Sequence, residues 1–424
     1  MLIKNFEALA TNKNRHSALT IVDAAYESIL VYEQIKKRLV FKNKALYRDG
    51  RMVFEDFKNL YFLGLGKGSY EAARAFEEIA GDLITEGAVI DISGGPLKKI
   101  KSLIGTHPYP SEQNKAAAQE LLKIADKAEK DDVIVAFIFG GGSALACFPS
   151  GNLMVIDLES IFREATKRGM AIGELNVIRR HLSQIHGGFL AQAAYPAWVY
   201  AFIVSDVPGN NLNIVSSGPT VFDPTTIYEA EQVAEKYHFA QLRFQETPKD
   251  PKIFEKVHNE LFLSNIEAVL AMMNKAKELG FNPSLWTLTK QGEAQFVGRE
   301  ALRVLRKLTT PAALIGAGET TVDLINVFNP GKGGRNQEVG AGALLDLQTD
   351  ELIISFASDA HDNTEAAGAV VDTETVWKAH RKGLKAEEFL NNHDIFRFFE
   401  QTNDLIFVEP LTANVSDLLL ALKF

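Results

Sequence analysis

Residues 132–142, DVIVAFIFGGG, indicate the fold class of this chain most directly. The apolar part is short, rich in valine, isoleucine and phenylalanine, and hardly alternates with polar residues. Such a run is typical of a parallel strand that is covered on both faces. Glycines follow at once, as they do where a strand turns sharply into a helix. The stretch therefore predicts a strand, a tight turn and a helix of an α/β fold.

The same pattern recurs along the chain, with helical stretches in between. The other apolar runs are NLYFLGLG (59–66), GAVIDISGG (87–95), AFIVSDVPG (201–209), AALIGAGE (312–319) and LIISFASD (352–359). Residues 69–80 and 174–194 carry apolar side chains at helical spacing. Because strands and helices alternate, we expect an α/β fold whose sheet is mainly parallel.

The length of 424 residues suits two or three domains. Residues 241–252, QLRFQETPKDPK, are polar and charged and include two prolines, which predicts a domain boundary. A long helix is expected next, at 263–279. We therefore expect domains at 1–240 and 241–424. The apolar run 405–410 could be an edge strand of either domain, so the chain could return to the first domain at its end.

Charge and hydropathy exclude several classes of partner. The formal net charge is −9, from 45 basic and 54 acidic side chains, whereas nucleic acids and anionic membranes are bound by clustered Lys and Arg. No apolar run approaches the ~20 residues of a membrane span, and residues 1–16 lack the apolar stretch of a signal peptide. One cysteine, Cys147, allows no intrachain disulfide. We expect a cytoplasmic protein without nucleic-acid or membrane partners.

The turn GGGS at 140–143 is the plainest candidate for a binding site. In open α/β sheets, ligands bind at the carboxyl ends of the strands. Three glycines let the backbone approach a ligand closely, and the following helix offers unpaired N–H groups. The turn therefore predicts a cradle for phosphate or carboxylate, formed by Gly140, Gly141, Gly142 and Ser143. The plain alternative is a tight turn without a ligand.

The turn GLGKGS at 64–69 allows two interpretations. It is not a P-loop, because Gly68 follows Lys67 where Ser or Thr is required. It approaches the dinucleotide fingerprint, although Ser69 replaces the third glycine, and Asp91 stands near the ~20-residue offset of a ribose-binding acid. An NAD(P)-dependent reductase is thus an alternative. The cation of Lys67 favours phosphate or carboxylate instead.

Two further segments carry groups suited to anions or metals. Residues 331–338, GKGGRNQE, include Arg335, whose guanidinium matches carboxylate and phosphate oxygens in bidentate fashion. Residues 205–226 form a long polar stretch, and such loops are uncommon unless functional. In it, Asp206 is a candidate to face a metal or a hydroxyl, and Ser217 and Gly218 are candidates to contact phosphate. HExxH, CxxC and GxSxG are absent from the sequence, which argues against zinc sites and α/β-hydrolases.

Taken in order, the motifs of the chain resemble those of the glycerate 2-kinase family, the class II glycerate kinases, some of whose members are labelled hydroxypyruvate reductase. They are KGSYEAAR (67–74), THPYP (106–110), GGGSAL (140–145), LNVIRRHLSQIHGG (175–188), SDVPG and SSGPTVFDPTT across 205–226, GAGETT (316–321), GGRNQE (333–338) and SDAHDNTEAAGAVVD (358–372). So many motifs in one order are far more specific than a single glycine loop.

The resemblance implies a larger N-terminal Rossmann-like domain and a smaller C-terminal MOFRL domain, with the active site in the cleft between them. It implies transfer of a phosphoryl group from ATP, with Mg2+, to the 2-hydroxyl of D-glycerate, giving 2-phosphoglycerate and ADP. Lys67 and Arg335 stand at the family's catalytic positions, and we expect Asp206 to act in catalysis and to hold Mg2+. The residues expected to bind substrate or nucleotide are Gly66, Ser69, Gly140, Gly141, Gly142, Ser143, Ser217, Gly218, Glu319, Thr320, Asn336, Glu338 and Asp359.

The chain also departs from the family pattern. His186, Phe189, Asn210 and Asn211 stand where the family usually has charged residues. We therefore expect the substrate to be D-glycerate or another small 2-hydroxy acid. A non-catalytic binding protein is a further alternative, against which the retained Lys67 and Arg335 speak. The sequence leaves the formation of a homodimer open.

Overall fold

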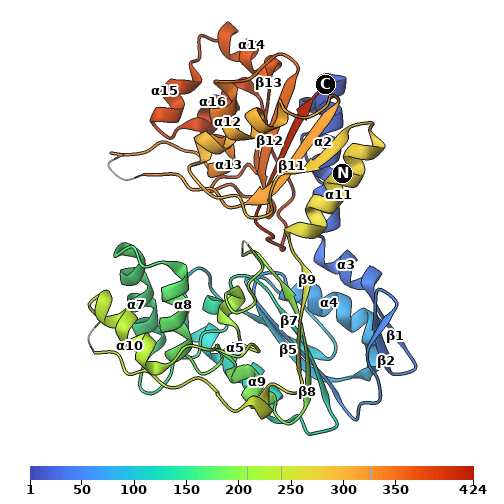
Figure 1. Cartoon of the computed structure of the whole chain (residues 1–424). Coiled ribbons are helices and arrows are strands. Elements are labelled where there is room, and N and C mark those ends of the chain that lie inside the picture. The colour runs from blue at the N-terminus through green and yellow to red at the C-terminus, as the bar shows by residue number, and fades with distance from the viewer. Residues whose placement is uncertain (208, 240, 325–326) are drawn as a thin grey trace. The chain divides into compact units, whose positions relative to one another are not determined.

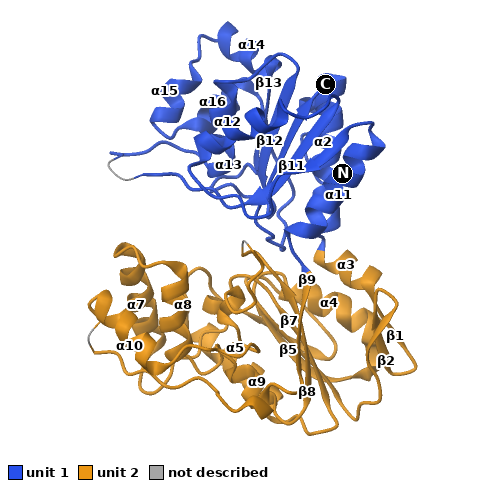
Figure 2. Ribbon diagram, in the orientation of Figure 1, with its two compact units in different colours: residues 1–30, 263–424 blue, residues 31–262 orange. Residues whose placement is uncertain are grey.

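The described part of the chain forms two units, and each unit contains a six-stranded sheet (Figures 1 and 2). The apolar runs of the sequence form strands of these sheets. Unit 1 comprises residues 1–30 and 263–424, and unit 2 comprises residues 31–262. The computed structural model describes residues 1–207, 209–239, 241–324 and 327–424. Pro208 of the SDVPG motif therefore lies outside the described residues.

The main sheet of unit 2 is the parallel sheet that the apolar runs predict. Its strands lie in the order β6 (Ile100–Ile104), β5 (Ile84–Asp91), β4 (Leu60–Leu65), β7 (Val133–Ile138), β8 (Trp198–Val204) and β9 (Val257–Leu263). The pairings from β6 through β8 are all parallel. Every residue of β4 and β7 is buried, as expected for central strands with helices on both faces. The carboxyl ends of β4, β7 and β8 therefore meet at one edge of the sheet.

Helices and a small antiparallel sheet surround these strands. The helices of unit 2 are α3 (Val31–Arg38), α4 (Ser69–Ala80), α5 (Glu112–Asp126), α6 (Gly142–Leu145), α7 (Val155–Lys167), α8 (Ile172–His181), α9 (Phe189–Ala194) and α10 (Ile227–Lys236). The small sheet consists of β1 (Leu39–Lys42), β2 (Ala45–Arg48) and β3 (Arg51–Phe54). The predicted helix 69–80 is confirmed as α4.

The single helix predicted at 174–194 is wrong, because the chain forms α8 and α9 there. Gly187 and Gly188 interrupt it with φ values of 60° and 90°, a conformation that helices exclude. Their N–H groups donate to the carbonyl oxygens of Ser217 and Gly218, at 2.9 Å each. These long-range hydrogen bonds replace the helical ones, so the apolar pattern alone does not reveal the break.

The sheet of unit 1 is mixed rather than mainly parallel. Its order is β10 (Asn282–Leu285), β11 (Ala312–Gly318), β15 (Asp417–Lys423), β12 (Glu351–Ala357), β13 (Gly368–Asp372) and β14 (Leu405–Ile406). The final strand, β15, lies between β11 and β12 and runs antiparallel to both. The run 405–410 contributes only β14, which pairs with β13 in this same unit. Of the two alternatives left open for this run, an edge strand of either domain, the structure has the edge strand of unit 1.

Helices cover both faces of this mixed sheet. They are α1 (Phe6–Leu9), α2 (Lys13–Ser28), α11 (Asn265–Glu278), α12 (Ala294–Leu305), α13 (Arg335–Leu344), α14 (Thr373–Arg381), α15 (Ala386–Asn391) and α16 (Ile395–Thr402). Figure 1 shows α2 and α11 on one side and α12, α13 and α16 on the other. In the described chain, no helix is both long enough and apolar enough to cross a membrane.

The first thirty residues belong to unit 1, which corrects the expected division at 240/241. Arg15 on α2 is fully buried, and its guanidinium forms ion pairs with Asp372 at 2.6 Å and with Asp404 at 2.8 Å. The hydroxyl of Tyr26 donates to the carbonyl oxygen of Ala357 at 3.0 Å. These partners lie more than 300 residues away in sequence, so no local composition signal marks the association.

Candidate active site

The glycine turn 140–143 lies against the turns that follow β4 and β8. The N–H of Lys67 donates to the carbonyl oxygen of Gly140 at 3.0 Å. A side chain on Gly140 would collide with the carboxylate of Asp206, and one on Gly66 would collide with the carbonyl oxygen of Phe139. Strand order therefore brings three predicted groups together in unit 2: the 140–143 turn, Lys67 and Asp206.

Lys67 and His107 flank this turn. A Cβ atom built on Gly141 would lie 3.1 Å from Nε2 of His107 and 3.4 Å from Cε of Lys67. His107 is exposed as a residue, but desolvation of its ring beside the turn, together with the positive charges of Lys67 and Arg179, lowers its pKa to about 4. His107 is therefore neutral near pH 7. The positive charge beside the turn comes from the lysine and from Arg179.

Serines from two loops meet at the same place. Ser216, Ser217 and Gly218 have φ values of 48°, 56° and 61°, and such strained backbone clusters at functional sites. The hydroxyl oxygens of Ser217 and Ser143 lie 2.8 Å apart. The predicted residues Ser143, Ser217 and Gly218 are thus neighbours of the glycine turn.

Two polar residues of α8 extend this cluster and were missed by the sequence reasoning. The Ser217 hydroxyl donates to Oδ1 of Asn176 at 3.1 Å, and Nη1 of Arg179 donates to the same oxygen at 3.4 Å. Asn176 and Arg179 are three residues apart and therefore share one face of α8. That spacing inside the 175–188 motif was the signal that could have identified them.

The turn at 66–69 does not offer the open helix end that its glycines suggest. Oδ2 of the buried Asp91 accepts the N–H groups of Gly68 at 2.8 Å and Tyr70 at 3.1 Å. The buried hydroxyl of Ser69 donates to the carbonyl oxygen of Ile90 at 2.8 Å. The chain's own carboxylate thus fills the N-terminus of α4. Because Asp91 is buried in this role, it is not placed to bind a ribose, which removes the main support for the dinucleotide alternative.

At the N-terminus of α13, which follows the second glycine-rich segment, a carboxylate of the chain also occupies the backbone N–H groups. The two carboxylate oxygens of Asp362 accept the N–H groups of Asn336 at 3.0 Å and Gln337 at 2.9 Å. The Asn336 side chain also donates to Asp362 at 3.1 Å and accepts from the Ser355 hydroxyl at 2.6 Å. Burial raises the pKa of Asp362 to about 6, although these donors oppose the rise. The side chain of Asn336, predicted to bind nucleotide, is therefore engaged within unit 1.

Arg335 is held by two carboxylates. Its Nε donates to Oδ2 of Asp417 at 2.5 Å, its Nη2 donates to Oδ1 of the same residue at 3.3 Å, and its Nη1 donates to Oε1 of Glu319 at 2.6 Å. Asp417 is buried, whereas Glu319 is exposed. The structure thus joins the predicted Arg335 and Glu319 and adds Asp417, which the sequence reasoning missed. Asp417 is the first residue of β15, the strand that was also missed.

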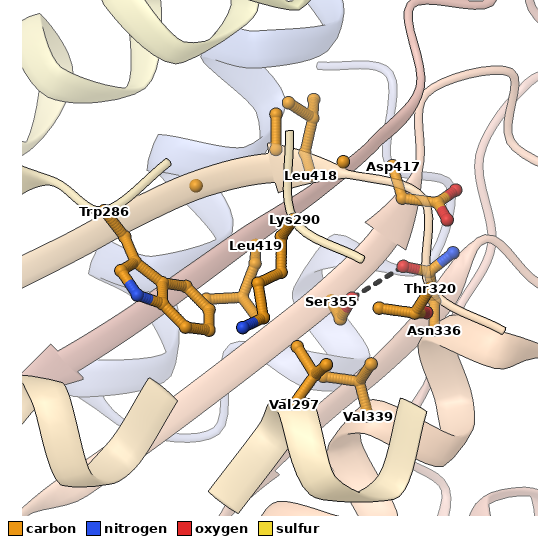
Figure 3. A pocket seen from close by; sticks show the side chains of 13 residues that line it. Trp286, Lys290, Val297, Thr320, Asn336, Val339, Ser355, Asp417, Leu418 and Leu419 are labelled. Carbon is orange, nitrogen blue, oxygen red and sulfur yellow. Dashed lines mark hydrogen bonds between the residues drawn. The ribbon is translucent and has the colours of Figure 1, made fainter. Parts of the chain in front are cut away.

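Thr320 and Asn336 line a small pocket of unit 1 (Figure 3). The pocket holds about 20 Å³ of space for water, enough for one water molecule and far below the ~300 Å³ at which ligand pockets begin. The Thr320 hydroxyl is buried and has no hydrogen-bond partner among the described residues. As it stands, this pocket has no room for a nucleotide.

Glu338 and Asp359 also have partners within unit 1. Glu338 is buried, and its Oε1 lies 2.7 Å from Nδ1 of His393. Burial raises the pKa of Glu338, against the effect of the histidine. Asp359 is partly exposed, and its Oδ1 accepts the N–H of His361 at 3.1 Å. Glu338 thus has a structural role in the core, and Asp359 is the more accessible of the two.

The positions that depart from the family pattern have mostly structural surroundings. His186 is buried with its Nδ1 2.8 Å from the Ser183 hydroxyl, and burial lowers its pKa to about 3. Phe189 lines a surface depression that includes none of the predicted site residues. Asn210 has a φ of 53°, and Oδ1 of Asn211 accepts the N–H of Asn213 at 3.1 Å. Phe189 therefore lies apart from the predicted site residues that line other parts of the protein.

A metal site made by the protein alone is not found. No group of three or more histidine, cysteine or acidic residues is arranged to hold an ion in the described ranges. Asp206 lies at the 140–143 turn as a single carboxylate. Mg2+ commonly uses only one or two protein carboxylates, because waters and substrate phosphates complete its coordination. Asp206 therefore fits Mg2+ bound together with phosphate.

Comparison with known proteins identifies both parts of the chain. Residues 17–247 match the domain of unknown function DUF4147, and residues 312–417 match the MOFRL family. A glycerate 2-kinase of Pyrococcus horikoshii is 32% identical over 96% of this chain and 97% of its own length. A D-glycerate 2-kinase of Thermotoga maritima is 31% identical over 93% and 97%. A putative hydroxypyruvate reductase of Agrobacterium vitis is 32% identical over 84% and 85%.

Two solved structures are also similar to this chain over nearly its whole length. The crystal structure of a glycerate kinase from Thermotoga maritima has a TM-score of 0.85 and 28% identity, covering 96% of this chain and 99% of that one. A protein from Pyrococcus horikoshii has a TM-score of 0.83 and 30% identity, covering 97% and 99%. The chain therefore belongs to the family of glycerate 2-kinases that joins a DUF4147 domain to a MOFRL domain.

Proposed function

We propose that the protein is a kinase that uses ATP and Mg2+ to phosphorylate the 2-hydroxyl of D-glycerate, giving 2-phosphoglycerate and ADP. The observation that carries this proposal is the assembly of Lys67, Asp206 and the 140–143 turn at the carboxyl edge of a parallel sheet. Membership of the glycerate 2-kinase family supports the choice of substrate.

The 140–143 turn is the part proposed to bind phosphate oxygens. In the described chain, the N–H groups of Gly142 and Ser143 donate to no protein acceptor. The helix ends at 66–69 and 334–337 differ, because Asp91 and Asp362 occupy their amides. Unused amides beside positive charge suit an anionic ligand. Of these three glycine turns, the GGGS turn therefore has the amides available to a phosphate.

Lys67 and Asp206 supply the charges that phosphoryl transfer requires. Such transfer depends mainly on alignment and on neutralising the charge of the phosphoryl group. Within the described residues, Lys67 forms no ion pair, so its charge is available to a reactant. Asp206 would hold Mg2+, and the bound ion would neutralise phosphate oxygens.

Arg335 is proposed to act on a negatively charged group of a reactant, as Lys67 is. Two hydrogen bonds to the carboxylate of Asp417 and one to Glu319 fix the direction of the Arg335 guanidinium. A fixed arginine loses little conformational freedom when it binds an oxyanion. Glu319 and Asp417 would then position Arg335 without contacting the reactant.

A coupled assay of ADP formation tests the proposal. D-Glycerate should give ATP-dependent turnover that a chelator of Mg2+ abolishes, and phosphorus NMR should identify the product as 2-phosphoglycerate. A panel of other 2-hydroxy acids, run in parallel, tests the choice of substrate. Absence of ADP formation with every acid, or formation of 3-phosphoglycerate, would contradict the proposal.

The reductase alternative has a separate readout. Oxidation of NADH in the presence of hydroxypyruvate would support it, and the buried position of Asp91 predicts that none occurs. A cytoplasmic location stays a prediction from the sequence.

A further inference from the structure

Among the residues that the structure describes, Lys67 and Arg179 of unit 2 have no carboxylate partner. No ion pair involving either side chain occurs within residues 1–207, 209–239, 241–324 and 327–424. Lys67 and Arg179 are both partly buried, whereas two buried arginines do have such partners: Arg180 lies 3.1 Å from Asp223, and Arg15 lies 2.6 Å from Asp372. Even partial burial of an unpaired charge is costly and is usually compensated by a partner.

Arg179 is partly buried. Its Nε is buried and has no hydrogen-bond partner in the described chain, and its guanidinium lies 4.7 Å from the ring centre of Phe162. Burial lowers the pKa of Arg179 to about 10, so the side chain stays charged near pH 7. The fold thus retains a positive charge in surroundings that disfavour it.

Hydrogen bonds connect this arginine to the glycine turn. Nη1 of Arg179 donates to Oδ1 of Asn176, which also accepts the Ser217 hydroxyl, and that hydroxyl lies 2.8 Å from the one of Ser143. Lys67 reaches the same turn from its other side, with Cε beside Gly141. The two cations therefore border one turn.

Two neutral imidazoles and one carboxylate lie near these cations. The pKa of His107 is lowered by desolvation of its ring and by the charges of Lys67 and Arg179. The pKa of His186 is lowered by burial and by the charge of Arg179. Near pH 7, neither histidine carries a charge that competes for an incoming anion. Asp206, beside Gly140, is the carboxylate at this turn.

We propose that Lys67 and Arg179 together bind one oxyanion group of a reactant beside the 140–143 turn. Arginine suits this role, since its fork donates in bidentate fashion to carboxylate or phosphate. The group is either the carboxylate of the hydroxy acid or a phosphate of the nucleotide. The identity of the reactants rests on the proposed function, but binding of an oxyanion does not require turnover.

Equilibrium binding to the full chain tests the subsite directly. Calorimetric titration with inorganic phosphate, D-glycerate and ATP would compare the wild type with Arg179→Gln and Arg179→Lys. The control is Arg74→Gln, which removes an exposed arginine of α4 whose partner is Glu71 at 2.7 Å. We expect Arg179→Gln to weaken at least one ligand ten-fold or more, Arg179→Lys to weaken it less, and the control to match the wild type. Affinities within two-fold of the wild type for all three ligands would overturn the proposal.

Steady-state kinetics separates the two sources of the oxyanion. A rise in KM for D-glycerate alone would assign the carboxylate, and a rise for ATP alone would assign a phosphate. If Arg179→Gln does not fold, Arg179→Lys keeps the charge but loses the fork, and an unchanged Kd and KM in that folded variant would overturn bidentate binding. If the wild type forms no ADP from any hydroxy acid, the proposed function fails, while the titration with phosphate still decides the subsite.

Discussion

Substituting Gly140 with alanine is a direct test of the glycine turn. The added methyl group would collide with the carboxylate of Asp206, which packs against the Cα of Gly140. Either the turn or Asp206 must move by roughly an ångström, and a misplacement of about 1 Å can cost ~100-fold in rate. Forced overpacking also costs ~1–3 kcal/mol of stability. We expect kcat to fall about 100-fold while the fold is retained.

The matched control is Gly173→Ala at the start of α8, where an added Cβ meets no atom within 4 Å. The assay measures ADP formation with D-glycerate and the melting temperature of each variant. Asp206→Ala combined with Gly140→Ala removes the colliding carboxylate. The double variant should therefore regain stability but not activity, since Asp206 is itself required. Near wild-type turnover in folded Gly140→Ala would refute the proposed role of this turn.

Other predictions concern charge and pH. Lys67→Ala should lower kcat about 100- to 1,000-fold, as loss of an oxyanion-stabilising group does, with Lys58→Ala, an exposed lysine paired with Glu129, as the control in the same assay. Asp417→Asn replaces a carboxylate that accepts two hydrogen bonds from Arg335. We therefore expect kcat to fall by a larger factor than KM for ATP rises. Small changes of equal size in kcat and KM would count against a role of Asp417 in positioning Arg335. The pKa of His186, about 3 in the folded protein, lies below the unfolded value of ~6.5, so the unfolded state binds more protons between these values. The contribution of this histidine to the free energy of unfolding is therefore fully present above pH 6.5. It is lost as the pH falls below that value, by up to ~1.4 kcal/mol per pH unit. Denaturant unfolding at pH 7.5 and 5.0 should show that the free energy of unfolding falls less between these pH values in His186→Asn than in the wild type. Equal decreases in the two proteins would contradict this reasoning.

The parallel core of unit 2 could be predicted because its signal is local. A buried parallel strand such as β7 is apolar at every position and ends in glycine, and both features are read from one short run. The carboxyl edge of the sheet then follows from topology, and Lys67, Gly140 and Asp206 are neighbours there.

The mixed sheet of unit 1 depends on distant partners. β15 is apolar like the other strands, but its neighbours β11 and β12 lie roughly 100 and 60 residues earlier in the chain. No property of 417–423 tells whether it runs parallel or antiparallel to them. The same limit applies to the first thirty residues, whose partners lie near the other end of the chain.

The roles of carboxylates were the least predictable part of the site. Asp91 looked like a ribose-binding acid from its spacing, yet it caps the turn that was expected to bind the ligand. Asp417 carried no motif signal, yet it holds Arg335. What a carboxylate does depends on which donors face it, and these donors come from other elements.

The discontinuous course of unit 1 bears on how the chain is made. Residues 31–262 form one uninterrupted stretch and can fold while synthesis continues. Unit 1 is completed later, because α2 is synthesised before residues 31–262 and the central strand β15 is synthesised after them. A shortened protein that begins at residue 263 would leave Asp372 and Asp404 without the arginine that neutralises them. Residues 263–424 are thus not an autonomous module, because their fold is completed by residues 1–30.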